Sequence, residues 1–254
     1  MRTLAIIPAR YGSSRLPGKA LADLCGKSVI EWVCAGVSNI EGIDDIVVAT
    51  DDERIAERVE MCGYRSMMTR STHRSGTERC GEVLERMGDE KYDVVVNIQG
   101  DEPFVEGEQI CSLLSAFDDE QTQIATLMKR ISSEGELWSV NNVKVVADKN
   151  GNALYFSRQT IPCVREFEKG EWLQKAVYYK HIGIYAYRPE VLREIVGLKK
   201  SLLEASEKLE QLRWLENGYK VRLVLTDHEN IGIDTMEDLE VARHWVTEHK
   251  QKHR

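Results

Sequence analysis

Three cationic side chains lie close together near the start of the chain, in the segment AIIPARYGSSRLPGKAL at residues 5 to 21. Arg10, Arg15 and Lys19 follow an apolar run and are interspersed with glycine and serine residues. Guanidinium groups match phosphate oxygens bidentately, and a lysine ammonium acts as a point charge. The spacing differs from the P-loop pattern, which excludes a Walker site. The segment therefore predicts either a phosphate-binding loop or a solvated basic loop.

Two aspartates further along the chain have the chemistry of metal ligands. Asp101 follows an apolar run and a glycine in NIQGDEP, and Asp234 follows another apolar stretch in NIGIDTMEDL. Mg²⁺ takes one or two carboxylates together with substrate phosphates and keeps several of its waters. The two aspartates are therefore candidates for a shared magnesium site. Each also has a plainer interpretation, because an aspartate in this position can cap the helix that follows it.

A serine–glycine turn and a histidine–tyrosine pair are further candidates. Ser75 and Gly76 in THRSGTER immediately precede a predicted helix, so they cap that helix or bring backbone groups up to a nucleobase. His181 and Tyr185 in YKHIGIYAY are four residues apart and lie on one face of a predicted strand. The segment SEKLEQLRWLENG has the polar face of an ordinary helix. Spacing alone does not distinguish the histidine or this helix from purely structural features.

Alternating elements in the first half of the chain must position these residues. Apolar runs that end in polar residues predict buried strands at 3–7, 46–50 and 94–98. Helices are predicted at 28–37, 52–63 and 106–117. This alternation is typical of a doubly wound parallel sheet. Such sheets bind ligands outside the carboxyl ends of their strands, which is where the cationic loop and Asp101 fall.

The second half of the chain has a different pattern. The segments VKVVAD and ALYFSR flank the turn signal at 149–152 and predict an antiparallel hairpin. A strand at 178–187, helices around 189–196 and 203–217, a strand at 219–226 and a final helix at 234–249 complete the pattern. Asp234 or Thr235 is suited to cap that final helix. We expect one mixed α/β domain over residues 1–254, with a smaller antiparallel and helical subregion at about 150–220.

Composition excludes several classes of protein. The 254 residues carry a formal charge of −8, which argues against a general nucleic-acid binder. The six cysteines form no C-x-x-C pair, as expected of reduced thiols in a cytoplasmic protein. No apolar stretch approaches the roughly 18 residues of a membrane span, so we expect no membrane partner.

Eight motifs occur in the order and spacing of one enzyme family. They are IIPARYGSSRLPGKAL, VVATDDERI, THRSGTER, VNIQGDEPF, VKVVADKNGNALYFSRQTIP, YKHIGIYAY, EKLEQLRWLENG and GIDTMEDL. Over nearly its whole length the chain resembles the 3-deoxy-manno-octulosonate (KDO) cytidylyltransferases, the CMP-KDO synthetases of lipopolysaccharide synthesis. CMP-sialic acid synthetases share the first loop but resemble this chain poorly after residue 140.

The resemblance implies a nucleotide-diphospho-sugar transferase type of fold and a reaction. CMP passes from CTP to the anomeric hydroxyl of KDO, pyrophosphate is released, and Mg²⁺ is the cofactor. A homodimer is also implied, with contacts through the subregion at about 150–220. An 8-amino analogue of KDO needs the same carboxylate contact as KDO, so both acceptors stay open.

The resemblance also assigns roles by position. The residues implied for nucleotide binding are Ala9, Arg10, Arg15, Lys19, Asp51, Ser75 and Gly76. Those implied for catalysis are Arg15, Lys19, Asp101 and Asp234, with the two aspartates as the metal ligands. Those implied for acceptor binding are Gln99, Arg158, His181, Tyr185, Glu210 and Gln211. Arg158 is the natural bidentate partner for the carboxylate of the sugar acid.

Small departures from the family pattern lie near the implied acceptor site. Leu202 stands where the family has proline, Ser206 replaces a usual apolar residue, and Cys163 replaces a common aromatic. They bear on acceptor identity more than on reaction type. The alternatives are a sugar-1-phosphate nucleotidyltransferase, which requires neither Arg158 nor His181, and a non-catalytic CTP-binding protein.

Overall fold

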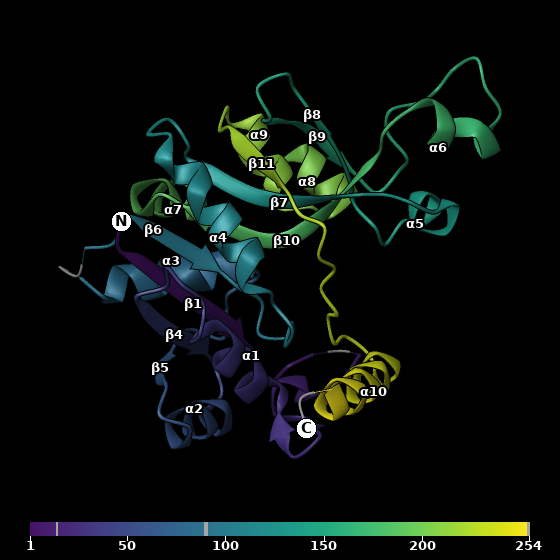
Figure 1. Cartoon of the computed structure of the whole chain (residues 1–254). Coiled ribbons are helices and arrows are strands. Elements are labelled where there is room, and N and C mark those ends of the chain that lie inside the picture. Colours follow the sequence, from purple (N-terminus) through teal and green to yellow (C-terminus); the bar gives the residue numbers. More distant parts are fainter. Residues whose placement is uncertain (14, 89–90, 253–254) are drawn as a thin grey trace. The chain divides into compact units, whose positions relative to one another are not determined.

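A computed structural model describes residues 1–13, 15–88 and 91–252, and it contains two compact units (Figure 1). Unit 1 comprises Met1–Cys111 and Asn230–Arg254, and unit 2 comprises Ser112–Glu229. Within the cationic loop, Ser14 lies outside the described residues. No helix in the described ranges is both long enough and apolar enough to span a bilayer.

Unit 1 is built on four parallel strands in the order β6–β1–β4–β5. They are β1 (Thr3–Ala9), β4 (Asp45–Thr50), β5 (Arg65–Met68) and β6 (Val94–Asn97). β1, β4 and β6 carry the predicted apolar runs and are almost entirely buried, as strands covered on both faces must be. The predicted parallel sheet is confirmed. The fourth strand, β5, was not predicted, because it is a short edge strand without an apolar run.

The described residues of unit 1 form five helices, several of which begin at polar capping residues. They are α1 (Val29–Val37), α2 (Glu53–Met61), α3 (Gly76–Arg86), α4 (Gly107–Ser115), which crosses the unit boundary, and α10 (Met236–Lys252). The turn η1 (Lys19–Leu21) and the two-residue strands β2 (Asp23–Leu24) and β3 (Lys27–Ser28) precede α1. Ser28 forms a capping box with Glu31, and Asp52 accepts a hydrogen bond from the Arg54 backbone.

The strand order of unit 1 reverses beside β1. The chain passes from β1 to β4 on one side, whereas β6 pairs with the other side of β1. The loops that leave the carboxyl ends of β1 and β6 therefore start next to each other, at the position where open α/β sheets bind ligands. Gly100 allows this approach, because a Cβ atom there would lie 2.8 Å from the Pro8 carbonyl oxygen.

One hydrophobic cluster of unit 1 joins segments from both ends of the chain. Leu16 of the cationic loop and Val29 of α1 pack with Ile233 and with Leu239 and Val246 of α10. Figure 1 shows α10, in yellow, beside the purple segment between β1 and α1. Leu16 and Ile233 directly neighbour Arg15 and Asp234 in the sequence, so burial of this cluster brings those two charged residues together.

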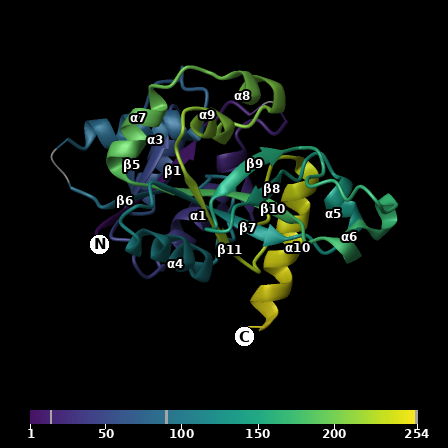
Figure 2. The ribbon, with the colours of Figure 1, turned by 90° about the horizontal axis from the view of Figure 1, so that it is seen from above.

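Unit 2 has five strands of mixed direction among the residues that the structure describes. They are β7 (Ile124–Arg130), β8 (Lys144–Ala147), β9 (Ala153–Ser157), β10 (Tyr179–Tyr187) and β11 (Val221–Leu225). β11 runs parallel to β7, and the pairs β7–β10, β10–β8 and β8–β9 are antiparallel (Figure 2). The predicted hairpin is confirmed as β8 and β9. β7 was not among the predicted strands.

Short helices and turns connect the strands of unit 2. They are η2 (Ala116–Asp118), α5 (Glu134–Trp138), η3 (Lys169–Glu171), α6 (Trp172–Lys175), α7 (Pro189–Val196), α8 (Leu202–Glu207) and α9 (Gln211–Glu216). The prediction of one helix over 203–217 is wrong. Lys208 has a left-handed backbone with φ 56° and ends α8 by donating its N–H to the Glu204 carbonyl.

Candidate functional site

Lys19 brings together the two aspartates that are candidate metal ligands. Its ammonium forms an ion pair with Asp101 and lies 2.8 Å from Asp234 Oδ1. Arg15 contacts the other oxygen of Asp234, at 2.9 Å from its Nη2. Four residues from three distant parts of the sequence thus share one charged cluster in unit 1.

Neither aspartate acts as a helix cap. Thr235 begins α10, because its hydroxyl accepts a hydrogen bond from the Asp238 backbone while the Asp238 carboxylate accepts one from the Thr235 backbone. Asp234 is thereby left to pair with Lys19 and Arg15. Asp101 lies six residues before α4 begins. The plainer interpretation offered by the sequence is therefore wrong for both residues.

The backbone fixes the two aspartates relative to each other. The Ile233 N–H donates to the Asp101 carbonyl oxygen at 2.8 Å. Asp234 follows Ile233 directly, so this bond and the buried Ile233 side chain hold both carboxylates at one place. The arrangement belongs to the fold and does not depend on flexible surface side chains meeting by chance.

The opposite charges of this cluster shift the pKa values of two of its members. Burial opposes the charge of Lys19, but Asp101 and Asp234 outweigh it and raise the pKa of the ammonium above its ordinary value. Burial likewise opposes the charge of Asp234, but Lys19 and Arg15 hold the pKa of its carboxyl below the ordinary value. Lys19 and Asp234 are therefore charged at neutral pH.

Asp101 and Asp234 fit the ligand chemistry of Mg²⁺. Oxygens of both carboxylates already reach a single cationic nitrogen, so they can also reach a single metal ion. In the described part of the chain, no group of three or more acidic, histidine or cysteine side chains is arranged to hold a metal. An ion at this place would take two protein carboxylates and fill its other positions with phosphate oxygens and water, as Mg²⁺ does.

Glu102 is a third acidic residue near this cluster, and it was not among the predicted site residues. Its carboxylate accepts a hydrogen bond of 2.6 Å from the Asn230 side chain. Burial and the charges of Asp101 and Asp234 raise the pKa of Glu102 to about 7. Its position directly after Asp101 in GDEP was the available signal. A carboxyl group beside two carboxylates is repelled by their negative charges, which raises its pKa.

The cationic loop has a defined shape at its first turn. The N–H groups of Ser13 and Gly18 both donate to the Tyr11 carbonyl oxygen at 2.9 Å. Gly18 has φ 70°, and a Cβ atom there would lie 2.9 Å from the Tyr11 ring. Arg54 covers the same ring at 3.5 Å from its centroid. The loop is therefore folded back on itself, which argues against a loosely solvated basic segment.

Arg10 lines a separate small cavity of unit 1, of about 140 Å³. The side chains and backbone around it come from the end of β1, the start of α3 and the segment after β6. The predicted site residues in its wall are Ala9, Arg10, Ser75, Gly76 and Gln99. The structure thus groups the predicted nucleotide-binding turn with Arg10, and it places Gln99, predicted to bind the acceptor, in the same wall.

Ser75 caps a helix and also lines this cavity. Its hydroxyl accepts a hydrogen bond of 3.1 Å from the Glu78 backbone at the start of α3. Gly76 follows with its Cα facing β1, because a Cβ atom there would lie 3.0 Å from Cγ of Pro8 and 3.6 Å from Gln99 Oε1. The capping interpretation is confirmed, and the capped turn lies in the wall of the cavity.

Asp51 makes a structural ion pair. The buried Arg79 guanidinium lies 2.8 Å from Asp51 Oδ2 and also donates to the Thr69 hydroxyl. Asp51 is therefore paired with a residue of α3, and it is not among the residues of the cluster around Lys19 or of the wall around Arg10.

His181 and Tyr185 of unit 2 are brought together by an irregularity in β10. Residues four apart in a regular strand are separated by about 13 Å. In β10 the pairing shifts, so that His181 faces Met128 and Tyr185 faces Thr126, only two positions apart on β7. The two rings consequently lie 5.2 Å apart between centroids. The same-face prediction is confirmed, and the bulge supplies the closeness that spacing did not predict.

Thr126 fixes the tautomer of His181. Its hydroxyl has one proton and lies within 3.2 Å of the Ile182 carbonyl and 2.8 Å of the Ile184 carbonyl, which can only accept. It must therefore accept from His181 Nε2, which is 2.9 Å away. Burial lowers the pKa of His181 to about 3, so the ring is neutral and its Nδ1 is a hydrogen-bond acceptor.

Buried polar groups surround Tyr185 on the side of α9. The Trp214 ring meets the Tyr185 ring edge to face at 5.1 Å. Gln211 Nε2 and Trp214 Nε1 are buried and have no hydrogen-bond partner among the described residues. Each such donor costs about 1–3 kcal/mol unless a ligand or water satisfies it. Trp214, which the sequence did not predict, thus has an unsatisfied buried donor and contacts Tyr185.

Glu210 and Arg158 are held by neighbouring residues of unit 2. Arg213 donates to the Glu210 carboxylate, and the Glu210 charge, after burial, helps to raise the pKa of Tyr185. Arg158 Nε donates at 2.8 Å to the carbonyl of Glu207, the last residue of α8. Five of the six predicted acceptor residues thus lie in unit 2, around β10, the end of β9 and the α8–α9 connection.

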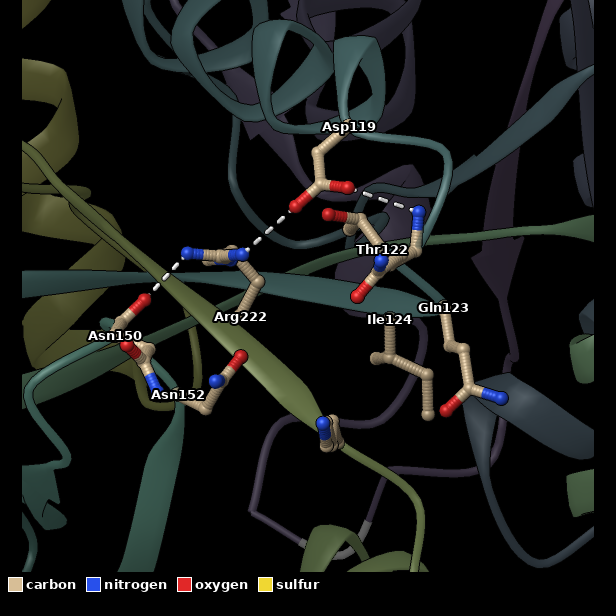
Figure 3. A pocket seen from close by; sticks show the side chains of 9 residues that line it. Asp119, Thr122, Gln123, Ile124, Asn150, Asn152 and Arg222 are labelled. Carbon is tan, nitrogen blue, oxygen red and sulfur yellow. Dashed lines mark hydrogen bonds and ion pairs between the residues drawn. The ribbon is translucent and has the colours of Figure 1, made fainter.

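A different cavity, of about 320 Å³, lies in unit 2, and none of the predicted site residues line it (Figure 3). Arg222 crosses it and pairs with Asp119 at 3.1 Å. Amide side chains such as Asn152 complete a polar wall beside the start of β7. The chemistry predicted from the sequence is located elsewhere.

Comparison with known proteins identifies close relatives. A family model described as Cytidylyltransferase matches residues 4–229. A Parabacteroides distasonis protein named 3-deoxy-manno-octulosonate cytidylyltransferase is 52% identical over 95% of this chain and 97% of its own length. A Bacteroides thetaiotaomicron protein of the same name is 52% identical over 97% and 98%. A solved CMP:2-keto-3-deoxy-manno-octonic acid synthetase complexed with CTP is 39% identical, with a TM-score of 0.90 over 98% and 100% of the two chains.

Proposed function

This chain belongs to the cytidylyltransferase family and, within it, to the 3-deoxy-manno-octulosonate cytidylyltransferases, and we propose its function from that premise. The enzyme transfers CMP from CTP to the anomeric hydroxyl of KDO and releases pyrophosphate. Lipopolysaccharide synthesis uses such a product. The observation that carries the proposal is the shared cluster of Lys19, Asp101 and Asp234, because it provides cations for a triphosphate and carboxylates for a metal at one place.

We propose that unit 1 binds CTP. The anomeric oxygen of the acceptor forms a bond to the α-phosphorus, and the bond from that phosphorus to the bridging oxygen of pyrophosphate breaks. Negative charge then grows on the leaving pyrophosphate, where Lys19 and Arg15 neutralise it. Arg10 contacts the phosphates from the wall that also contains Ala9, and the Ser75–Gly76 turn presents backbone groups to cytosine. Asp51 supports this wall through Arg79.

Asp101 and Asp234 would hold Mg²⁺, which when bound neutralises phosphate charge and lowers the pKa of the attacking hydroxyl. Lys19 now occupies both carboxylates, so we propose that its ammonium turns toward the phosphates when the ion and the nucleotide bind. The protein needs to contribute little covalent chemistry, since this type of transfer depends mainly on alignment of the reactants and on electrostatics.

We propose that the acceptor is held by Arg158, His181, Tyr185, Glu210 and Gln211 of unit 2. Arg158 pairs with the carboxylate of the sugar acid. His181 accepts a hydrogen bond from a sugar hydroxyl at Nδ1, and Gln211 donates one, since its buried nitrogen has no partner in the described structure. We further propose that both units serve one catalytic domain, that the enzyme is a cytoplasmic homodimer, and that residues of about 150–220 form the dimer contact.

The test is a pyrophosphate-release assay with each of the four nucleotides. The acceptors are KDO, its 8-amino analogue and a panel of sugar 1-phosphates, all with Mg²⁺. Turnover with CTP and KDO is expected. Turnover with sugar phosphates and none with KDO would indicate a sugar-1-phosphate nucleotidyltransferase. CTP binding without any pyrophosphate release would indicate a non-catalytic nucleotide-binding protein.

A further inference from the structure

Lys144 is a buried lysine that no predicted role uses. It is the first residue of β8, and its side chain is fully buried, with 0% exposure. Its Nζ donates to three carbonyl oxygens, those of Ser139 at 2.6 Å, Asn142 at 2.8 Å and Arg158 at 3.1 Å. Three donors and three acceptors satisfy the hydrogen bonding of the ammonium completely.

The positive charge of Lys144 has no acidic partner. No carboxylate of the described residues contacts its Nζ, and all three of its partners are neutral. Burial, together with the charge of Arg158, lowers the pKa of Lys144. Its neighbour in the β10–β8 register, the buried Lys180, shows the usual solution, since it pairs with both Glu136 and Glu229. Burying a charge without an opposite charge costs free energy, so a lysine at this position calls for an explanation.

The contacts of Lys144 converge on Arg158. One is the Arg158 carbonyl itself, and the other two hold a turn in which the Asn142 N–H donates to the Ser139 carbonyl. Within this turn, the Val140 carbonyl accepts a hydrogen bond of 3.2 Å from Arg158 Nη1. Lys144 therefore fixes the backbone of Arg158 and also the carbonyl that orients its guanidinium.

Glu207 holds Arg158 from the other side. Its carboxylate accepts bonds from the Arg158 N–H and the Ser157 hydroxyl, and its carbonyl accepts from Arg158 Nε. No described residue bonds to Arg158 Nη2, which leaves that nitrogen to a ligand. Lys144 and Arg158 carry two positive charges against the single negative charge of Glu207. The group thus retains one positive charge for an anion.

We propose that Lys144 is a positioning residue that locks the Arg158 guanidinium in the orientation that receives the carboxylate of the acceptor, and that its charge makes the place selective for an acid. The proposal rests on the proposed function, because it takes a sugar acid as the ligand of Arg158. Lys144 touches no substrate and acts through the carbonyls of Ser139, Asn142 and Arg158.

The test compares Lys144→Met with Lys180→Met, a matched removal of a buried lysine from the neighbouring strand. In steady-state pyrophosphate release, Lys144→Met is expected to raise KM for KDO by about tenfold to a hundredfold, with kcat and KM for CTP changed less than about twofold. Lys180→Met is expected to lower thermal stability without this selective rise. If Lys144→Met does not fold, Lys144→Gln removes the same charge while keeping an amide donor.

A double-mutant cycle separates positioning from a general structural role. In an Arg158→Gln background, Lys144→Met is expected to change KM for KDO by less than about twofold, because Arg158 is no longer there to be oriented. Equal effects of Lys144→Met with and without Arg158, or equal rises in KM for KDO and for CTP, would overturn the inference. Failure of the proposed function is distinguishable, since the unaltered protein would then release no pyrophosphate with KDO.

Discussion

Single side chains decide which residues of this enzyme are structural and which are available for chemistry. Thr235 caps α10, so that the carboxylate of Asp234 is left to Lys19 and Arg15. Thr126 satisfies Nε2 of His181, so that Nδ1 is left to a ligand. In both cases a threonine makes the structural hydrogen bond, so that a group of Asp234 or of His181 is left for other partners.

Asp101→Asn is expected to lower kcat by roughly 10²–10³, because one of the two carboxylates proposed to hold Mg²⁺ at the triphosphate is lost. Steady-state pyrophosphate release and a thermal melt of the same preparation measure the effect on activity and on folding. Asp119→Asn, which removes a carboxylate from the ion pair with Arg222 in unit 2, is the matched control and should keep its rate. Near-normal Mg²⁺-dependent turnover of Asp101→Asn would remove Asp101 from the metal site.

His181 is expected to make the folded state less stable in acid. The pKa of His181 is about 3 in the folded protein, below its ordinary value of 6.5. As the pH falls from 6.5 toward 3, the unfolded chain binds a proton that the folded chain does not, so stability is lost over this window and is unaffected above it. The free energy of unfolding should fall by ~1.4 kcal/mol per pH unit relative to His181→Gln. Urea unfolding at several pH values measures this, and parallel curves for the two proteins would contradict it.

The strands of unit 1 determine where the loops that carry the charged residues begin. β1 is flanked by β4 and β6, and the loops after β1 and β6 contribute Lys19 and Asp101. The segment just before α10 adds Asp234 from the far end of the sequence, because Ile233 and the apolar face of α10 pack with Leu16 in one cluster. Parallel strands and the one packed face of α10 are sufficient to assemble the charged cluster.

Gly100→Ala is expected to destabilise unit 1 by about 1–3 kcal/mol, because the new methyl group would lie 2.8 Å from the Pro8 carbonyl oxygen and 3.0 Å from Ala9 Cβ. The neighbouring atoms include backbone, which cannot move aside as a flexible side chain does. Gly135→Ala, where a methyl group meets nothing within 4 Å, is the control. Chemical unfolding of both variants measures the difference, and equal stability would show that β1 and β6 can separate at their ends.

Sequence patterns predicted the elements whose burial is uniform. β1, β4 and β6 appear as unbroken apolar runs because both faces are covered, whereas β5 is a polar edge strand and gave no such signal. The break between α8 and α9 was missed because Lys208, which adopts the left-handed conformation there, is not a glycine. Lys144 was missed because a lysine at the start of a strand normally points to solvent.

At the scale of the whole molecule, positive charges are concentrated in two groups although the chain is acidic overall. The chain carries a net charge of −8, yet Arg10, Arg15 and Lys19 come from one short loop, and Lys144 and Arg158 form a second cationic group in unit 2. An acidic protein that binds a triphosphate and a sugar acid must concentrate its cations where those anions bind. In the structure, Lys19 and Arg15 are paired with the carboxylates that we propose as Mg²⁺ ligands.

The most direct test of this account is calorimetric titration of CTP, with Mg²⁺ and with EDTA, into the unaltered protein, Asp101→Asn and Asp234→Asn. The unaltered protein should bind CTP more tightly with Mg²⁺ than without it. Both variants should lose that enhancement and yet bind metal-free CTP more tightly than the unaltered protein, because Lys19 is released from a carboxylate. A full Mg²⁺ enhancement in either variant, or weaker metal-free binding in both, would contradict the proposal that these aspartates and cations share one magnesium–triphosphate site.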